Sequence, residues 1–345
     1  MQIFHDPGHR AHESLSELHE GALVRSFECP ERMDVILSAL AEAGFALPQA
    51  PPPVPWQALQ AVHDTAYLRF LETAHDRWVA EHGPGDALPF TWPMPGLRRA
   101  PVPKALDGAL GAYNFSVDTA ITAGTWAAAT GAAACAVAAA GVVSAGAATA
   151  FALGRPPGHH AHADLYGGYC FLNNAAIAAE DLRRAGAAQI AVLDIDYHHG
   201  NGTQAIFYDR ADILFLSLHA DPAVEFPYFL GHACETGEGP GEGATQNYPM
   251  PHGTEFAAWT ERLEHACGRV AAHGSDALVV SLGVDTFEGD PISRFRLQTS
   301  DFPAIGARIA RLRLPTVWVM EGGYAVEALG RNVAGVLQGY LNDCV

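Results

Sequence analysis

Short apolar runs recur through the second half of the chain, and each has the length of a buried strand. They are TAFAL at 149–153, IAVLDID at 190–196, ILFLSL at 213–218, ALVVSLGV at 277–284 and TVWVM at 316–320. Continuous apolar runs of this kind are typical of parallel strands that are covered on both faces. Helix-like segments lie between them, for example at 174–185 and 256–272. This alternation predicts a layered α/β fold with a parallel sheet.

The stretch from Thr119 to Gly154 contains no charged residue, so it requires a membrane check. Ala and Gly dominate it, with Ser and Thr interspersed and few large apolar side chains. A membrane-spanning helix needs about 20 strongly apolar residues. We therefore interpret the stretch as a buried helix at about 125–140, followed by a strand at about 148–153.

Polar residues follow every apolar run, and parallel strands would bring them to one edge of the sheet. Ligands of open α/β sheets bind at the carboxyl ends of the strands. The convergence of five such ends predicts a functional site there. The residues are His159 and His160, then Tyr197, His198 and His199, then His219, Asp285, and Glu321 to Tyr324.

The segment Asp194-Ile195-Asp196-Tyr197-His198 points to a metal site. Side chains two residues apart on a strand share a face, so Asp194, Asp196 and His198 are expected to point the same way. Two carboxylates that enter from an apolar strand are costly unless they are paired or bound to a metal. Asp196, His198 and Asp285 would supply three ligands for zinc or another borderline divalent ion. The fourth position would remain for water, as in catalytic sites.

Three further side chains complete a candidate catalytic set. His159 and His160 follow the segment Arg-Pro-Pro-Gly, in which the prolines restrict the backbone and the glycine permits a sharp turn. A loop of this kind can direct both imidazole rings inward. One of them could take the proton of a metal-bound water, and Asp194 could fix the tautomer of a histidine ring. Tyr324 follows a glycine pair, and its hydroxyl could donate to an oxyanion.

Composition and charge narrow the choice of partner. With 20 Lys and Arg against 38 Asp and Glu, the net charge of −18 argues against a nucleic acid or an anionic membrane. The negative charge is compatible with a cationic substrate, but it could equally serve only to keep the protein soluble. Six scattered cysteines and a polar start, MQIFHDPGHR, indicate a reduced, cytoplasmic location without a signal peptide.

Taken together, these segments resemble the arginase/deacetylase superfamily, and in particular the bacterial acetylpolyamine amidohydrolases, which are relatives of the histone deacetylases. The resemblance implies a single catalytic domain over residues 1–345. It implies a three-layer α/β fold whose central, mostly parallel sheet has eight strands and is flanked by helices. The matching segments are SFECPERM at 26–33, RPPGHH at 155–160, GGYCFLNN at 167–174, LDIDYHHGNGTQ at 193–204, FLGHACETGEGPGEG at 229–243, SLGVDTFEGDP at 281–291 and MEGGY at 320–324.

The resemblance also implies roles for particular residues. One zinc ion would be held by Asp196, His198 and Asp285. His160 would act as general base and then general acid, with His159 and Asp194 giving electrostatic support, and Tyr324 would bind the carbonyl oxygen. Asn201 stands where several histone deacetylases have an aspartate, so His160 should be less basic. A potassium ion would lie near Asp194, Asp196, His198, Ser217 and Leu218.

The same resemblance implies a narrow substrate channel. Tyr169 and Phe226 would form its walls, Gly168 would leave room, and Ile292 would border it. Acidic residues would hold a distant ammonium at the mouth, and the matching positions are Glu17, Asp107 and Asp118. The last two are one methylene shorter than the expected Glu, which leaves the preferred chain length open. A long loop at about 81–103 would narrow the mouth in a homodimer.

Other interpretations stay open beside deacetylation of acetylated polyamines. The substrate could be acetyl-lysine in peptides or proteins, or another acylated small amine, and a non-catalytic acyl-amine binding protein is a remote alternative. A dinuclear manganese site is disfavoured, because Gly200 and Phe287 stand where the second metal needs carboxylates. A serine hydrolase is disfavoured as well, since the chain lacks Gly-x-Ser-x-Gly.

Overall fold

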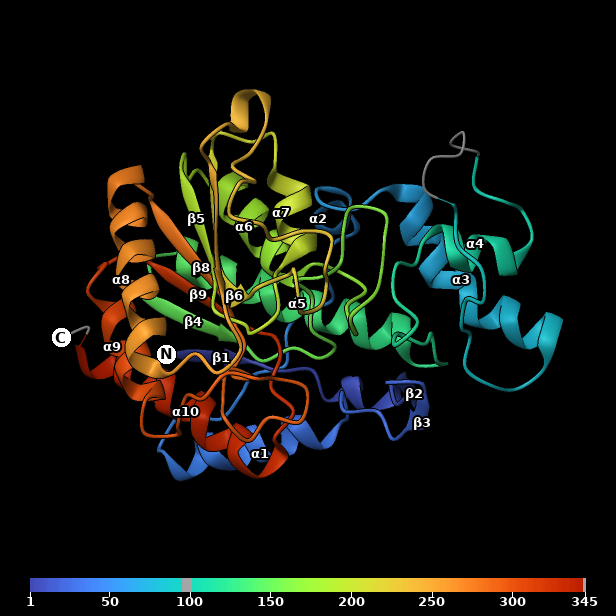
Figure 1. Ribbon diagram of the computed structural model, residues 1–345, viewed down its shortest axis with the longest axis horizontal. Helices are drawn as coiled ribbons and strands as arrows, with labels where there is room; N and C mark the ends of the chain where they lie inside the picture. Colours follow the sequence, from blue (N-terminus) through green and yellow to red (C-terminus); the bar gives the residue numbers. More distant parts are fainter. Residues whose placement is uncertain (95–100, 344–345) are drawn as a thin grey trace.

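The computed structural model of the protein describes residues 1–94 and 101–343 (Figure 1). A seven-stranded sheet forms its centre, and every strand pairing in that sheet is parallel. The α/β prediction is confirmed, but this sheet has seven strands in place of the expected eight. In spatial order the strands are β1 (Gln2–Phe4), β4 (Thr149–Ala152), β9 (Thr316–Met320), β8 (Ala277–Leu282), β5 (Ile190–Asp194), β6 (Ile213–Ala220) and β7 (Thr245–Met250).

The apolar pattern predicted the five inner strands and missed the two at the edges. β1 has only three residues, and β7 reads TQNYPM, with Pro249 inside it. Proline cannot donate to a ladder, so it is tolerated in edge strands such as this one. A separate antiparallel hairpin, β2 (Glu17–His19) with β3 (Ala22–Val24), contributes residues to the cavity at the edge of the sheet.

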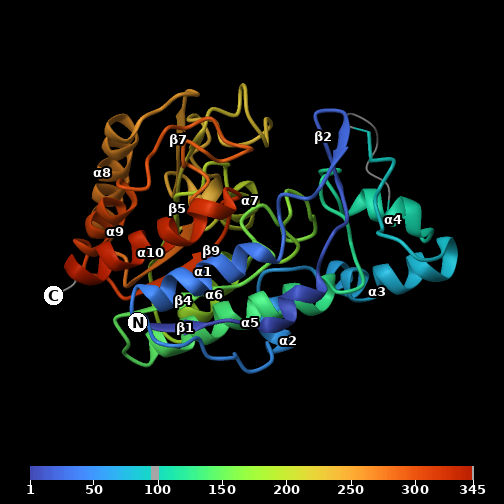
Figure 2. The ribbon, with the colours of Figure 1, turned by 90° about the horizontal axis from the view of Figure 1, so that it is seen from below.

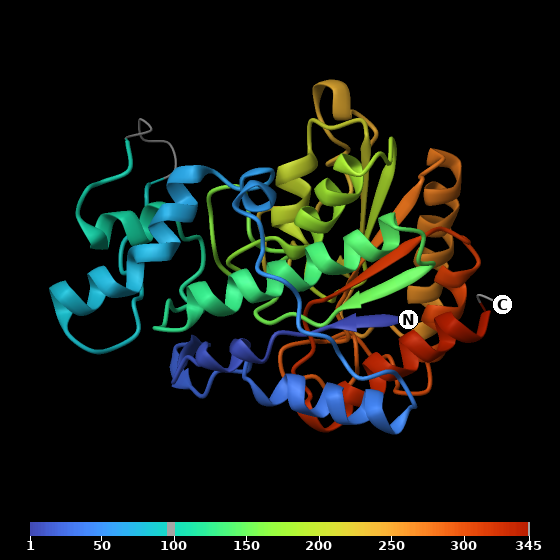
Figure 3. The same cartoon turned by 180° about the vertical axis from the view of Figure 1, so that it is seen from behind.

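Helices cover both faces of the sheet, which gives three layers (Figures 1 and 3). Successive strand residues alternate between two cores, as in Val192 and Val279 on one face and Leu193 and Val280 on the other. On the first face, α5 (Thr125–Ser144), α6 (Asn174–Arg184) and α7 (Asn201–Phe207) pack on the strands, and α2 (Trp56–Gln60) packs on α6. Helices α3 (Thr65–His82) and α4 (Leu106–Ala112) extend the same core beyond the sheet (Figure 1). The second face is covered by α1 (Glu31–Glu42), α8 (Phe256–His273), α9 (Phe302–Ala310) and α10 (Val326–Asp343).

Helix α5 is the element that the membrane check singled out. It is one turn longer than predicted, and among the described residues it alone is long and apolar enough to cross a membrane. However, 61% of its most apolar window is buried inside the fold. Its many alanines allow close packing against α6 and β4, so it is a core helix, as the sequence predicted.

Helices α3 and α4 lie on the side of the molecule away from α8 and α9 (Figures 1 and 2). The loop expected at 81–103 begins after α3 ends at His82. Residues 83–94 and 101–105 form no helix, and residues 95–100 of that expected loop lie outside the described residues. Short 3-10 helices lie at Pro7–Ala11 and Gly239–Gly241. The five cysteines that the structure describes are free thiols.

Candidate active site

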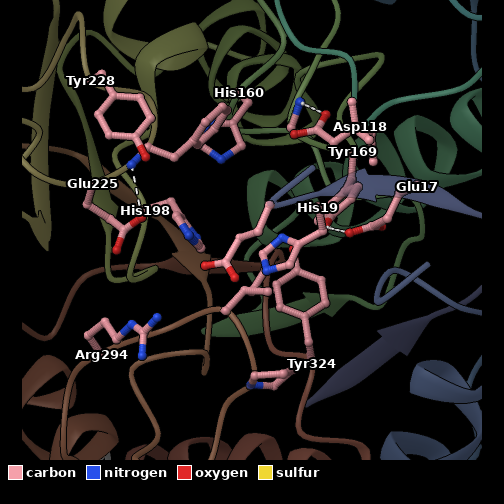
Figure 4. Close-up of a pocket in the computed structure, with 16 residues that line it drawn as sticks. Glu17, His19, Asp118, His160, Tyr169, His198, Glu225, Tyr228, Arg294 and Tyr324 are labelled. Carbon is pink, nitrogen blue, oxygen red and sulfur yellow. Dashed lines mark hydrogen bonds between the residues drawn. The ribbon is translucent and has the colours of Figure 1, made fainter. Parts of the chain in front are cut away.

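The predicted polar residues meet because four of their strands are neighbours. β4, β9, β8 and β5 lie side by side in the sheet and run parallel, so the segments after their carboxyl ends share one edge. His160, His198 and Tyr324 all border one cavity of about 370 Å³ at this edge (Figure 4). This is the place at which parallel sheets bind ligands.

The chain leaves the strand earlier than the alternation predicted. β5 ends at Asp194, and residues 196–198 form bends. The Asp196 amide donates to Asp194 Oδ1 at 3.1 Å, and the His198 amide donates to Asp196 Oδ1 at 2.9 Å. These side-chain turns replace the expected extended strand. As a result Asp194 pairs with His159, while Asp196 joins the metal group; the expectation of one shared strand face was wrong.

Asp196, His198 and Asp285 form the candidate metal centre. One ligand atom of each lies within 4.8 Å of the others, and His198 Nδ1 is 3.1 Å from Asp285 Oδ2. Burial, followed by repulsion from Asp196, raises the pKa of Asp285 well above its usual range. A divalent cation between the two buried carboxylates would relieve this repulsion. Two carboxylates and one imidazole nitrogen are suitable ligands for zinc, so the residues fit the ion.

Two glycines make room for this centre. A Cβ on Gly283 would lie 2.0 Å from Asp196 Oδ2, and one on Gly322 would lie 2.5 Å from the same oxygen. The Gly322 amide donates to that oxygen at 2.8 Å. The other carboxylate is also fixed, because the Tyr197 amide donates to Asp285 Oδ1 at 2.8 Å. The ligands are therefore oriented by backbone groups before any ion binds.

The adjacent histidines have different environments. His159 Nδ1 donates to Asp194 Oδ2 at 3.0 Å; burial alone would lower the pKa of His159, but Asp194 and Asp196 raise it to about 10. His160 Nδ1 donates to Asn201 Oδ1 at 2.6 Å. Burial, together with the positive charges of His159 and His198, lowers the pKa of His160 well below its usual value. His160 is thus neutral at pH 7, with Nε2 free to accept a proton.

Tyr324 borders the cavity and is held by residues that the sequence analysis missed. Asp290 Oδ2 accepts the amides of Tyr324 at 2.7 Å and Ala325 at 3.2 Å. Burial raises the pKa of Asp290 to about 6. The Arg32 guanidinium lies 4.8 Å from the Tyr324 ring and donates to the Gly323 carbonyl at 2.7 Å. Both residues belong to segments that carried the resemblance, but their action on Tyr324 is visible only in three dimensions.

The expected channel walls are present. Tyr169, Phe226, Gly168 and Ile292 all line the cavity. The Phe226 ring is 5.0 Å from the His160 ring, and the Tyr169 ring is 5.5 Å from that of Tyr324. Gly168 has a φ of +56°, and a Cβ there would lie 2.6 Å from His160 Cδ2. A side chain at this position would therefore displace His160.

The three expected acidic residues at the mouth have different positions. Glu17 and Asp118 line the cavity, but their carboxylates also build its wall. Glu17 accepts the Tyr169 hydroxyl at 2.8 Å, and Asp118 accepts the Gly168 amide at 3.1 Å. Asp107 is absent from the cavity lining: it lies on α4, where its carboxylate is 3.2 Å from His82 Nε2. In this chain Asp107 therefore does not line the cavity, and its expected role at the mouth stays a prediction.

The expected potassium residues lie where β5 and β6 pair. Asp194 stands directly opposite Ser217 in the register, and Leu218 follows on β6. The Ser217 hydroxyl is 2.8 Å from Nδ1 of His219. The other ring nitrogen of His219, Nε2, is 2.8 Å from the Gly231 carbonyl oxygen. His219, singled out in the sequence, is therefore held by Ser217 and Gly231 and is not a member of the metal group.

The cavity has further lining residues that sequence reasoning did not identify. They include charged side chains on the β2–β3 hairpin and on the segments beside Phe226 and Ile292. Because these side chains come from separate segments, no local pattern could have grouped them. They are Leu18, His19, Glu20, Glu225, Tyr228, Pro291 and Arg294 (Figure 4).

Comparison with known proteins agrees with this geometry. Residues 26–340 match the histone deacetylase domain family. The chain is 53% identical over 341 residues to acetylpolyamine amidohydrolase 1 of Pseudomonas aeruginosa, covering 99% of this chain and 98% of that protein. It is 49% identical over 340 residues to acetylpolyamine amidohydrolase of Mycoplana ramosa, covering 98% and 99% of the two chains.

A solved structure also resembles the whole fold. The crystal structure of acetylpolyamine aminohydrolase from Burkholderia pseudomallei has a TM-score of 0.94 and 39% sequence identity, covering 99% of this chain and 98% of that one. The family resemblance seen in the sequence is thereby confirmed. The chain belongs to the histone deacetylase family, and it is a hydrolase that acts on amide bonds.

Proposed function

We propose that the protein is a zinc-dependent amidohydrolase that deacetylates acetylated polyamines such as acetylputrescine, acetylcadaverine and acetylspermidine. The observation that carries this proposal is one cavity that is lined by carboxylates and by His198, a member of the metal group with Asp196 and Asp285. The negative lining favours a cationic amine. The names of relatives with about 50% identity point to the same substrate class.

A zinc ion on Asp196, His198 and Asp285 would polarise the amide carbonyl and lower the pKa of a bound water. Asp194, Asp196, His198, Ser217 and Leu218 are the residues that we assign to a structural potassium ion. The pairing of Asp194 with Ser217 supports this assignment, since it places these two residues side by side at the end of two strands.

His160 is the proposed general base. Its Nδ1 is occupied by Asn201, so Nε2 takes the proton of the attacking water and later returns it to the leaving nitrogen. His159 and Asp194 form a buried pair, and the His159 ring lies 4.0 Å from the His160 ring. Burial, together with the positive charge on His159, keeps the pKa of His160 low, and this favours return of the proton to the amine.

Tyr324 is the proposed oxyanion donor. Its ring lies in the cavity between Arg32 and Tyr169, so its hydroxyl donates to the carbonyl oxygen as negative charge develops there. Burial raises the pKa of Tyr324 well above its usual value, so the phenol retains its proton. The products are acetate and a free amine.

Gly168, Tyr169, Phe226 and Ile292 form the proposed channel, with Glu17 and Asp118 at its mouth. We further propose that the whole chain is one catalytic domain and that the protein is a cytoplasmic homodimer. Large apolar side chains are exposed beside the mouth, which supports association there. They include Leu18, Tyr228 and Phe229.

The test is acetate release by zinc-loaded protein from acetylputrescine, acetylcadaverine, acetylspermidine and an acetyl-lysine peptide, with His160→Ala as the inactive control. Turnover of the acetylpolyamines above the peptide supports the proposal. A preference for the peptide moves the assignment to lysine deacetylation. Tight amine binding without turnover would instead indicate a non-catalytic binding protein.

A further inference from the structure

Among the residues that the structure describes, Arg294 is the one arginine or lysine that lines the cavity, beside four carboxylates. The charged residues that line this cavity are Glu17, Glu20, Asp118, Glu225 and Arg294. An arginine here opposes the binding of a cationic amine, because like charges repel. The substrates considered so far give this side chain nothing to do.

The Arg294 guanidinium is free to bind a ligand. It is exposed, and it makes no ion pair or side-chain hydrogen bond within residues 1–94 and 101–343. Glu225, which also lines the cavity, has other neighbours: it accepts the Tyr197 hydroxyl at 2.8 Å and lies 3.2 Å from His252 Nε2. Thus no described residue forms an ion pair with Arg294.

Arg294 and the carboxylates of Glu17 and Asp118 lie on opposite sides of the cavity, with His160 and His198 between them (Figure 4). A substrate whose acetamide reaches the histidines can thus meet Glu17 and Asp118 on one side and Arg294, beside Glu225, on the other (Figure 4). A guanidinium binds a carboxylate through two parallel hydrogen bonds, which few other groups can accept as well.

We infer that Arg294 binds the α-carboxylate of an α-amino acid whose side-chain amine is acetylated, such as Nε-acetyl-lysine or Nδ-acetylornithine. The acidic side would bind the α-ammonium, and the acetamide would occupy the channel. This inference rests on the proposed deacetylase activity. The reaction is the same hydrolysis: water adds across the amide C–N bond, acetate leaves, and the side-chain nitrogen gains a proton.

Two substrates isolate the carboxylate. N-acetylcadaverine is Nε-acetyl-lysine without its carboxylate, and Nε-acetyl-lysine carboxamide keeps the α-ammonium but lacks the negative charge. The experiment measures kcat/KM for all three with the zinc-loaded protein at low ionic strength, where charge effects are screened least. The variants are Arg294→Gln and, as a matched control, Arg296→Gln, which alters an exposed arginine two residues away and outside the cavity lining.

We expect wild-type protein to hydrolyse Nε-acetyl-lysine, and Arg294→Gln to lower its kcat/KM about tenfold, mainly through KM, as one charge-assisted pair is lost. The same variant should raise kcat/KM for N-acetylcadaverine and the carboxamide, because a repelling charge is gone. Arg296→Gln should change none of the three. If Arg294→Gln changes kcat/KM equally for all three substrates, the inference is overturned. It is also overturned if the wild-type protein hydrolyses N-acetylcadaverine but not Nε-acetyl-lysine.

Two further arms complete the test. A dipeptide that ends in acetyl-lysine carries the carboxylate without a free α-ammonium, and its preference over free Nε-acetyl-lysine would overturn the assignment to an amino acid. If no substrate is hydrolysed, the proposed function itself fails. Calorimetry with lysine and cadaverine then still decides the role of Arg294: lysine binding that Arg294→Gln weakens supports it, and absent lysine binding overturns it.

Discussion

Replacing Gly322 with alanine should disable the metal centre through one added methyl group. The new Cβ would lie 2.5 Å from Asp196 Oδ2 and 2.7 Å from Asp285 Oδ2. Ordinary contacts of a Cβ begin at 3.4 Å. The φ of Gly322 lies outside the left-handed region, so the effect would arise from lack of space rather than from backbone strain.

The size of the displacement sets the expected loss. To reach 3.4 Å, each oxygen would have to move several times farther than the roughly 0.2 Å by which metal–ligand distances vary. Mutation of the residues that orient metal ligands typically lowers metal affinity by about 10- to 100-fold. Because two ligands are displaced here, we expect the upper end of that range or more.

The assay is a zinc titration against a competing chelator, together with activity at rising zinc concentration. Gly141→Ala is the matched control, because a Cβ at this exposed position in α5 meets nothing within 4 Å. That variant should bind zinc as wild type does, and alanine in a helix should stabilise it by up to about 1 kcal/mol. Circular dichroism verifies that Gly322→Ala is folded. Wild-type zinc affinity in folded Gly322→Ala would refute the reasoning.

Three other changes have definite expected outcomes. Tyr324→Phe removes the oxyanion donor and should lower kcat by about 100-fold or more with little change in Tm, as steady-state kinetics and thermal melts will show. Asn201→Asp places a negative charge 2.6 Å from His160 Nδ1, which raises the pKa of His160. Since the neutral ring is the base, the acid limb of the kcat/KM profile should move about 1–3 units to higher pH, and an unmoved limb would exclude His160. Asp290→Ala frees the Tyr324 amide and should reduce kcat, but in a Tyr324→Phe background it should have little further effect if Asp290 acts only by positioning Tyr324.

Much of the fold and part of the site could be predicted from the sequence, because their signals are local. A strand buried on both faces must be apolar along its length, and this marks β4, β5, β6, β8 and β9. The polar residues that follow those strands are forced together by parallel pairing alone. For this reason Asp196, His198, Asp285, His160 and Tyr324 could be grouped by their positions after the apolar runs.

The edge strands and the mouth of the cavity depended on tertiary structure. β1 has only three residues, and β7 contains polar residues and a proline, so neither carries the continuous apolar run that marks the inner strands. The path of α3 and α4, which no residue pattern encodes, places Asp107 beside His82 and outside the cavity lining. Arg294 lines the same cavity as Glu17 and Asp118 only because separate segments of the chain converge there. Residue type and spacing determined which chemistry the chain carries, whereas the path of its loops decided which charges a substrate would meet.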